Sequence, residues 1–150
     1  VAIKPGGPLA FWLWGRKPVF GLPGNPVSAM VTFEEFVRPA IRKMAGHRIL
    51  GRPLTRAVLS ENFSKRPGKT VFARAVISRE GEGLVARPLG NQSSGALAAM
   101  SRANGLIILP SEKGDLKAGT VVQVRLLGDH AWWVKSGLLE KDNYWIRDME

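Results

Sequence analysis

The stretch Gly21-Leu22-Pro23-Gly24-Asn25-Pro26-Val27-Ser28 marks the point where a short hydrophobic strand runs into a long helix. Asn25 is a favoured N-cap residue and Pro26 a favoured first helical residue, so the stretch predicts a helix start. The backbone amides of Val27 and Ser28 are then expected to point forward, unpaired. Such a helix end attracts anions, so the same residues also suggest a class of ligand.

The first unit, residues 1–50, is predicted to be the strand-loop-helix end of an α/β domain. Strands are expected at 10–14 and 18–22 and a helix over 26–45. The apolar residues of the helix recur at helical spacing over a wide face, so the helix must be covered on most sides. One strand pair is too small for this. Because the chain opens without Met in an apolar run, we expect a fragment whose missing sequence supplies the rest of the sheet.

Pro39 and Gly46 predict how this helix bends and where it ends. Proline lacks a backbone N–H and disfavours helical geometry at the preceding residue, so we expect a kink at Arg38. Gly46 is the expected C-cap, because glycine adopts positive φ more readily than other residues.

The second unit, residues 51–128, is predicted to be a small all-β barrel with one short helix. After a linker, the apolar period changes from helical to alternating, and clusters of Gly, Pro, Asn and Ser separate the candidate strands. The short helix is expected within 95–101. The candidate strands are 54–61, 70–79, 83–89, 105–109 and 120–127.

The tail, residues 129–150, is aromatic and slightly acidic. Five Asp and Glu residues against three Lys and Arg residues give it a net charge of −2, whereas the whole chain carries +10. We expect its aromatic side chains to dock on the body of the protein or on a neighbour. These side chains are Trp132, Trp133, Tyr144 and Trp145.

The net charge of +10 favours anionic partners. Nucleic acid has only this charge in its favour and is not expected, because Trp14 beside Arg16 and Lys17 is more often a core strand residue than a stacking platform. The chain has no cysteine, and its two histidines lack partners at ligand spacing, so no protein-ligated transition metal is expected. No run is long enough to span a membrane and no signal-peptide pattern is present, so a cytoplasmic setting is the default expectation.

Four separate elements offer groups that suit an anion: the Lys4 turn, the helix start with Ser28, the strand residue Arg74, and a loop with Ser94. Each has an ordinary explanation alone, since surface lysines are usually solvated and capping residues usually only cap. Arg74 lies in an apolar strand, where a guanidinium needs a partner or an anionic ligand, unless it sits at a barrel rim. Taken together, the four elements predict an oxyanion or phosphate ligand, a small anionic substrate.

Several motifs resemble those of the molybdopterin molybdenumtransferases, the MoeA and gephyrin family. The resemblance covers about residues 1–127 and leaves the tail unmatched. It implies that residues 1–50 end a molybdopterin-binding α/β domain and that residues 51–128 are the complete C-terminal β-barrel domain. The similar segments, in the same order and spacing, are Lys4-Pro5-Gly6, residues 21–29, 90–95 and 103–107, and Leu109-Pro110.

The resemblance implies an activity, the insertion of molybdate into adenylylated molybdopterin with the help of Mg²⁺, in molybdenum cofactor biosynthesis. The acidic catalytic residues and the Mg²⁺ ligands are implied to lie outside this chain, so the chain alone is expected to be inactive. A homodimer of the intact protein is also implied. The alternative, from another class, is a non-catalytic anion-binding or protein-scaffold module of the same fold.

The resemblance also implies the ligand-binding residues. Lys4 and Pro8 match the motif turn near the molybdate, and Ser28 matches the serine at the helix start. Arg74 and Ser94 match barrel residues that face the same cleft between the two domains. A tetrahedral dianion favours several donors that converge from rigid elements, which agrees with this set. The loop expected to bind molybdopterin is Pro23, Gly24, Asn25 and Pro26.

Gly7 departs from the family pattern Lys-Pro-Gly-Lys-Pro, which has a second lysine at this position. One cation is therefore missing from the turn that carries Lys4. Arg16 or Lys17 is the expected source of compensation, if there is any.

Overall fold

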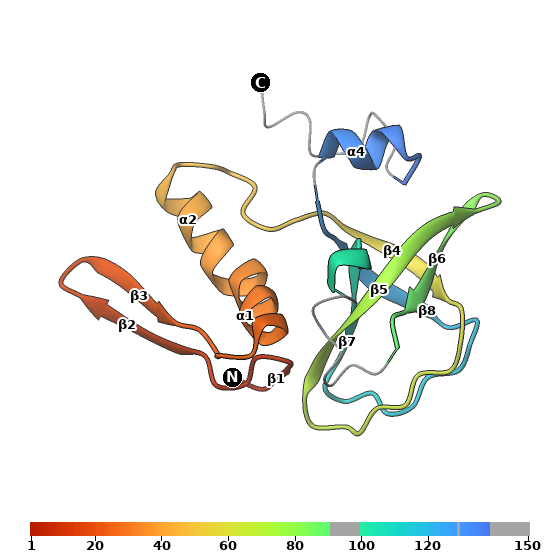
Figure 1. The fold of residues 1–150 in the computed structure, drawn as a ribbon, viewed down its shortest axis with the longest axis horizontal. Coiled ribbons are helices and arrows are strands. Elements are labelled where there is room, and N and C mark those ends of the chain that lie inside the picture. The colour runs from red at the N-terminus through yellow and green to blue at the C-terminus, as the bar shows by residue number, and fades with distance from the viewer. Residues whose placement is uncertain (91–99, 129, 139–150) are drawn as a thin grey trace.

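The computed structural model describes residues 1–90, 100–128 and 130–138 (Figure 1). Along the chain come a short strand, an antiparallel hairpin, an interrupted helix, a closed barrel and a final short helix. The predicted fold class is thus confirmed, with the end of an α/β unit followed by an all-β barrel. No helix in these described ranges combines the length and the apolar character that a membrane crossing requires.

The barrel contains five strands, and their sheet order is β5-β6-β4-β8-β7, with β7 returning to β5. This closure pairs both edges of the sheet, which an open sheet would leave exposed. All five strands were predicted to within two residues at each end. Of the predicted short helix, residues 100 and 101 are described and are helical. The strands are β4 (Leu54–Leu59), β5 (Thr70–Glu80), β6 (Gly83–Pro88), β7 (Gly105–Leu109) and β8 (Val121–Leu126).

The barrel core is built from alternate residues of each strand, because successive side chains point to opposite faces. On β5 the inward residues are Ala73, Ala75 and Ile77, all essentially buried. The final helix, α4 (His130–Lys135), adds Trp133 to the same core with 0% of its surface exposed. The prediction that tail aromatics dock on the body is therefore confirmed for Trp133. The other three aromatic side chains of the tail lie outside the described part.

The helix over 26–44 consists of α1 (Pro26–Thr32), a π-helical turn η1 (Phe33–Val37) and α2 (Arg38–Met44). Pro39 has no N–H to donate to the carbonyl of Glu35, so regular α-helical bonding cannot continue at this point. The irregularity predicted at Arg38 takes the form of the π turn that precedes it.

The helix ends in a Schellman motif at Gly46, as its φ of 81° allows. The Gly46 N–H donates to the Lys43 carbonyl at 3.1 Å, and the His47 N–H donates to the Arg42 carbonyl at 3.0 Å. Gly46 therefore terminates the helix as predicted.

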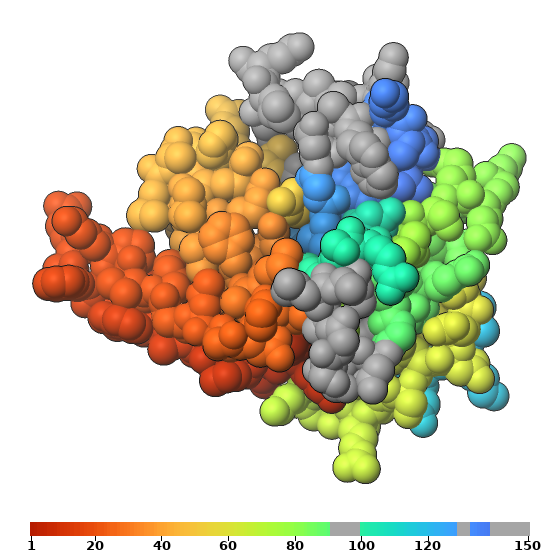
Figure 2. Space-filling model, in the orientation of Figure 1, coloured from red at the N-terminus to blue at the C-terminus, as the bar shows by residue number. Residues whose placement is uncertain are grey.

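A two-stranded hairpin, β2 (Ala10–Trp14) and β3 (Lys17–Gly21), stands apart from the barrel and projects from the body of the molecule (Figures 1 and 2). Its cross-strand contact is between Phe11 and Phe20, whose ring centroids are 5.0 Å apart. All five residues of β2 are exposed, and Trp14 is 80% exposed. The expectation that Trp14 is a core residue is therefore wrong for this chain, because the described residues place nothing over the hairpin.

The first unit and the barrel are joined by strand pairing and by a shared apolar cluster. Strand β1 (Ile3–Lys4) pairs in parallel with β5, so that Lys4 lies opposite Val71. Beside this pairing, Val31 of α1 packs with Phe72 of β5 and Leu106 of β7, and Ile3 of β1 packs against the same cluster. The helix therefore covers one outer face of the barrel.

Ion pairs tie the π turn to the barrel beside this cluster. Glu34 accepts two hydrogen bonds from the Arg52 guanidinium, at 2.6 and 3.0 Å, and lies 3.7 Å from Arg38. Arg125 Nε lies 2.6 Å from Glu35 Oε1, an ion pair without a well-aligned hydrogen bond. Burial raises the pKa of Glu35, and the neighbouring Arg125 opposes this rise. Both acids thus bridge the two units.

Candidate anion-binding site

The start of α1 is capped as predicted, but the two amides at this end are already bonded. Asn25 Oδ1 accepts hydrogen bonds from the N–H groups of Val27 at 3.0 Å and Ser28 at 3.3 Å, and Pro26 is the first helical residue. The prediction that these amides are unpaired is therefore wrong, because the side chain that caps the helix also uses its donors. These two amides are therefore already bonded within the cap and are not free donors for an anion at this helix end.

The turn that follows Lys4 packs directly on α1, and Gly6 permits this close approach. Gly6 has a φ of 108°, and a Cβ at this position would lie 2.5 Å from the Thr32 Cγ2 atom. Thr32 is fully buried and donates from Oγ1 to the Ser28 carbonyl at 2.8 Å. The turn with exposed Pro8 at its end is thus held against the helix that carries Ser28.

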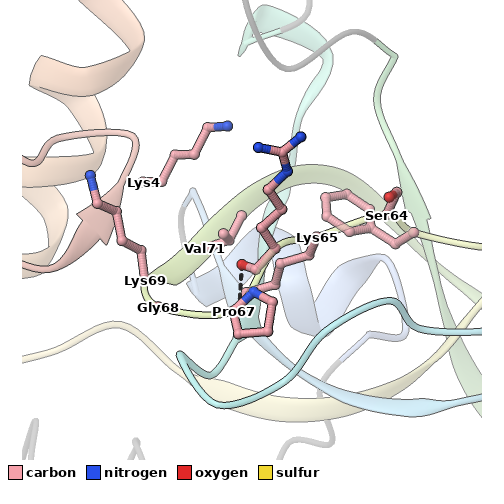
Figure 3. Close-up of a pocket in the computed structure, with 9 residues that line it drawn as sticks. Lys4, Ser64, Lys65, Pro67, Gly68, Lys69 and Val71 are labelled. Carbon is pink, nitrogen blue, oxygen red and sulfur yellow. Dashed lines mark hydrogen bonds between the residues drawn. The ribbon is translucent and has the colours of Figure 1, made fainter.

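Lys4 is an exposed residue of β1 that lines a pocket of about 600 Å³ (Figure 3). Besides Lys4, the pocket is lined by Phe63, by residues 64–69 of the loop between β4 and β5, and by Val71. The loop contributes Lys65, Arg66 and Lys69. The pocket therefore has cations from both units of the chain.

Arg74 lies in the middle of β5 and is 1% exposed. It shares a face with Phe72, two residues away, and this face is turned toward α1. Burial lowers the pKa of Arg74, although an arginine remains charged in proteins. Arg74 is therefore a buried residue on the face of β5 that meets α1, not an exposed rim residue.

The predicted site residues are only partly brought together among the described residues. Lys4 lies opposite Val71, and Arg74 lies three residues further along β5, a separation of about 10 Å along the strand. Arg74, Ser28 and Pro8 do not line the pocket that Lys4 lines. Ser94 falls outside the described residues, so a site shared by all five residues stays a prediction.

Arg66 and Lys69, which line the same pocket as Lys4, were not predicted from the sequence as its neighbours. The run Lys65-Arg66-Pro67-Gly68-Lys69 was the available signal, since it combines three cations with turn residues. Its proximity to Lys4 depends on the β1–β5 pairing, which the sequence pattern did not indicate.

A hydrogen-bond network shapes the loop of this pocket. The buried Lys65 ammonium group donates to the carbonyls of Lys113 at 2.8 Å and Ser111 at 3.4 Å. Asp115 Oδ1 accepts from the Lys65 N–H at 2.8 Å and from the Ser64 hydroxyl at 2.9 Å. The hydrogen bond from the Lys65 backbone N–H, and to a smaller extent the one from the Ser64 hydroxyl, lower the pKa of Asp115. The loop between β4 and β5 is thus fastened to the loop after β7.

Comparison with known proteins links both units to one family. Residues 56–127 match the family model described as "MoeA C-terminal region (domain IV)", and residues 1–43 match the model described as "Probable molybdopterin binding domain". Molybdopterin molybdenumtransferase 2 of Mycobacterium tuberculosis is 36% identical over 124 residues, which is 83% of this chain and 30% of the relative. Molybdopterin molybdenumtransferase of Haemophilus influenzae is 36% identical over 127 residues, which is 83% of this chain and 31% of the relative.

Solved structures show the same similarity. The molybdopterin biosynthesis moeA protein from Pyrococcus horikoshii OT3 superposes with a TM-score of 0.68 at 28% identity, over 84% of this chain and 30% of that one. A molybdenum cofactor biosynthesis protein from Pyrococcus furiosus gives a TM-score of 0.69 at 27% identity, over 84% of this chain and 43% of that one. The chain thus spans about 30% of the length of the curated relatives it matches.

Proposed function

We propose, because the chain belongs to the molybdopterin molybdenumtransferase (MoeA) family, that it is the C-terminal part of an enzyme that inserts molybdate into adenylylated molybdopterin. The observation that carries this proposal is the presence of both family units in one chain, joined through the pairing of β1 with β5. We further propose that the intact enzyme is a cytoplasmic homodimer.

The proposed oxyanion site consists of Lys4, Pro8, Ser28, Arg74 and Ser94. Lys4 and Arg74 supply positive charge, and charge-assisted hydrogen bonds to an oxyanion are shorter and stronger than neutral ones. Ser28 supplies a hydroxyl donor, and Pro8 fixes the turn that follows Lys4. The strand pairing and the packing of Gly6 on Thr32 support this site, because both hold the Lys4 turn close to the elements with the other donors.

The loop Pro23, Gly24, Asn25 and Pro26 is proposed to contact molybdopterin. It leads into α1, whose first residue is Pro26, and Asn25 uses its side-chain oxygen for the helix cap. For Mg²⁺ the described residues offer no fitting site, because they contain no group of three or more His, Asp or Glu side chains that could hold a metal ion. The proposal therefore derives no step through Mg²⁺ on this chain.

The proposed function predicts that this chain alone does not carry out the insertion. It spans only about 30% of the length of its relatives, and no acidic metal site lies within its described residues. The test incubates adenylylated molybdopterin, molybdate and Mg²⁺ with either the purified 150-residue chain or an intact relative, and then measures cofactor by reconstitution of a molybdenum enzyme. Product formed by the chain at the rate of the intact relative would contradict this prediction.

The proposed site is tested by binding molybdate to the intact enzyme in a calorimeter. Ser28→Ala and Arg74→Gln should each weaken binding roughly tenfold, as expected for the loss of one charge-assisted contact. Ser60→Ala, on an exposed residue outside the proposed site, serves as the control. If Ser28→Ala and Arg74→Gln bind molybdate as the parent does, the oxyanion site is wrong, whereas the family assignment is unaffected.

A further inference from the structure

The pocket beside β1 presents three cationic side chains from two distant parts of the sequence. Lys4 comes from β1, and Arg66 and Lys69 come from the loop between β4 and β5. All three are exposed, and none takes part in an ion pair within the part of the chain that the structure describes. Figure 3 shows Lys4 and Lys69 extending to the same side of the segment that carries Gly68. Their charge is therefore available to a ligand.

The other charged groups at this pocket are already engaged. The Lys65 ammonium group is buried and donates to backbone carbonyls, so it supports the loop rather than facing a ligand. The carboxylate of Asp115, which contacts the pocket-lining residues Ser64 and Lys65, accepts a hydrogen bond from each of them. Among the described residues, no acidic side chain lines the pocket itself.

The size and the walls of the pocket exceed what a bare tetrahedral oxyanion needs. Its volume of about 600 Å³ lies in the range typical of small-molecule sites, which is about 300 to 1,000 Å³. Phe63, Pro67 and Val71 provide apolar surface beside the cations. A matching ligand carries one strongly anionic group and an organic body. A phosphate monoester, with a charge of about −1.5 to −2 at pH 7 and three acceptor oxygens, has this combination.

We propose that Lys4, Arg66 and Lys69 bind the phosphate group of an organic phosphate monoester, whose body rests on Phe63, Pro67 and Val71. Arginine and lysine are the usual ligands of phosphate, since both give charge-assisted hydrogen bonds. The inference shares Lys4 with the proposed oxyanion site and rests on the proposed function in that residue, whereas Arg66 and Lys69 belong to this pocket and not to that site.

The test measures binding of phenyl phosphate and of inorganic phosphate to the 150-residue chain by titration calorimetry at fixed ionic strength. Phenyl phosphate should bind more tightly than inorganic phosphate, because only the ester can use the apolar walls. Arg66→Gln and Lys69→Gln should each weaken binding of phenyl phosphate roughly tenfold. The matched controls are Arg56→Gln and Lys43→Gln, which remove the same charges from exposed residues outside the pocket and should change binding less than about twofold.

Three results would overturn the proposal. The first is the lack of phenyl phosphate binding at millimolar concentration by the folded parent chain. The second is an equal loss of affinity in the pocket variants and their matched controls, which would indicate attraction to the overall positive charge. The third is binding of molybdate, weakened by Arg66→Gln and Lys69→Gln, without binding of phenyl phosphate. This result would make the pocket part of the oxyanion site. Melting temperatures of all variants confirm that they are folded.

Discussion

Asn104 extends the barrel sheet with its side chain. Its Oδ1 accepts from the Ile77 N–H at 2.6 Å, and its Nδ2 donates to the Ile77 carbonyl at 2.9 Å. The next residue, Gly105, is the first of β7 and pairs with Ala75. The amide of Asn104 thus replaces a backbone partner where β7 has not yet begun, and it satisfies two polar groups that would otherwise lack one.

Asn104→Ala is expected to lower the free energy of unfolding by about 1 to 3 kcal/mol, because both bonding groups of Ile77 lose their partner. Urea denaturation followed by circular dichroism measures this change. The control is Asn62→Ala, which removes an exposed single bond from Asn62 Oδ1 to the Ala118 N–H and should cost less. Equal losses of unfolding free energy in the two variants would show that the two hydrogen bonds of Asn104 contribute no more than the one of Asn62.

Gly7 is a position where the family lysine can be restored. Its φ lies outside the left-handed region, and a Cβ there would make only ordinary contacts of 3.6 Å with the carbonyls of Ile3 and Val1. Gly7→Lys adds a cation to the turn that follows Lys4, so molybdate binding at the proposed oxyanion site of the intact enzyme should tighten by roughly ten- to a hundredfold. Calorimetry at fixed ionic strength measures the change.

Arg16 and Lys17 are the two cations that could replace the charge missing at Gly7. They lie at the tip of the β2–β3 hairpin, at its far end from β1 (Figure 1), about 20 Å along the strand from Pro8. Arg16→Ala and Lys17→Ala are therefore expected to leave binding unchanged. Weaker binding by these two variants, together with no gain from Gly7→Lys, would mean that the hairpin supplies the compensating charge.

The lowered pKa of Asp115 predicts a loss of stability in acid. Its pKa is lowered from 3.8 in the folded protein, so its contribution is present above pH 3.8 and is lost as the pH falls toward the lowered value. At pH 6 the melting temperature of the parent should be higher than that of Asp115→Asn. The two melting temperatures should converge as the pH falls below 3.8. Scanning calorimetry over this range measures the gap. Glu61→Gln, on an exposed residue, is the control, and a gap that stays constant down to pH 2 would contradict the prediction.

Between elements, the pair Glu34 and Arg52 joins the π turn to the segment before β4. Their double hydrogen bond is partly buried, with side-chain exposures of 15% and 20%. A double-mutant cycle of Glu34→Gln and Arg52→Gln should give a coupling free energy of about 1 to 2 kcal/mol. The cycle is needed because Arg52 also bonds to the Gly128 carbonyl. Strictly additive effects in urea denaturation would mean that the pair contributes nothing to the joint.

The elements themselves could be predicted from the sequence because their signals are local. Alternation and turn residues locate the barrel strands, and Asn25, Pro26 and Gly46 locate both ends of the helix. The pairing of β1 with β5 could not be predicted, because a strand of two residues has almost no pattern and its partner lies more than 60 residues away.

The candidate site was predictable in its residue types but not in its geometry. Burial of Arg74 depends on which face of β5 meets α1, which is a matter of packing between units. The pairing of the Val27 and Ser28 amides follows from the same Asn25 cap that the sequence predicts, so this error was avoidable. The basic pocket was missed because its cations come together only when the chain folds.

At the scale of the whole molecule, α4 turns the start of the tail into part of the barrel. Of the side chains that the structure describes, Trp133 is the largest fully buried one, and it belongs to the barrel core together with Leu138. Trp133→Ala should therefore lower the free energy of unfolding by about 3 to 5 kcal/mol, the usual cost of deleting a buried aromatic side chain. Thermal and urea denaturation measure this loss.

The matched control is Trp12→Ala, which removes the same side chain from the exposed hairpin, where half of its surface faces solvent. It should change the free energy of unfolding by less than about 1 kcal/mol. If the two substitutions cost the same, the tail is not part of the cooperative core.

The pairing of β1 with β5 has a mechanical consequence for the two units. A relative rotation of the two units that preserves these backbone hydrogen bonds would turn about them. Lys4 belongs to this pairing and would keep its position, whereas the hairpin, which projects away from β1 (Figure 1), would move most. Opening or closing of the joint would then change the distance from Ser28 to the barrel while the place of Lys4 beside Val71 stays constant.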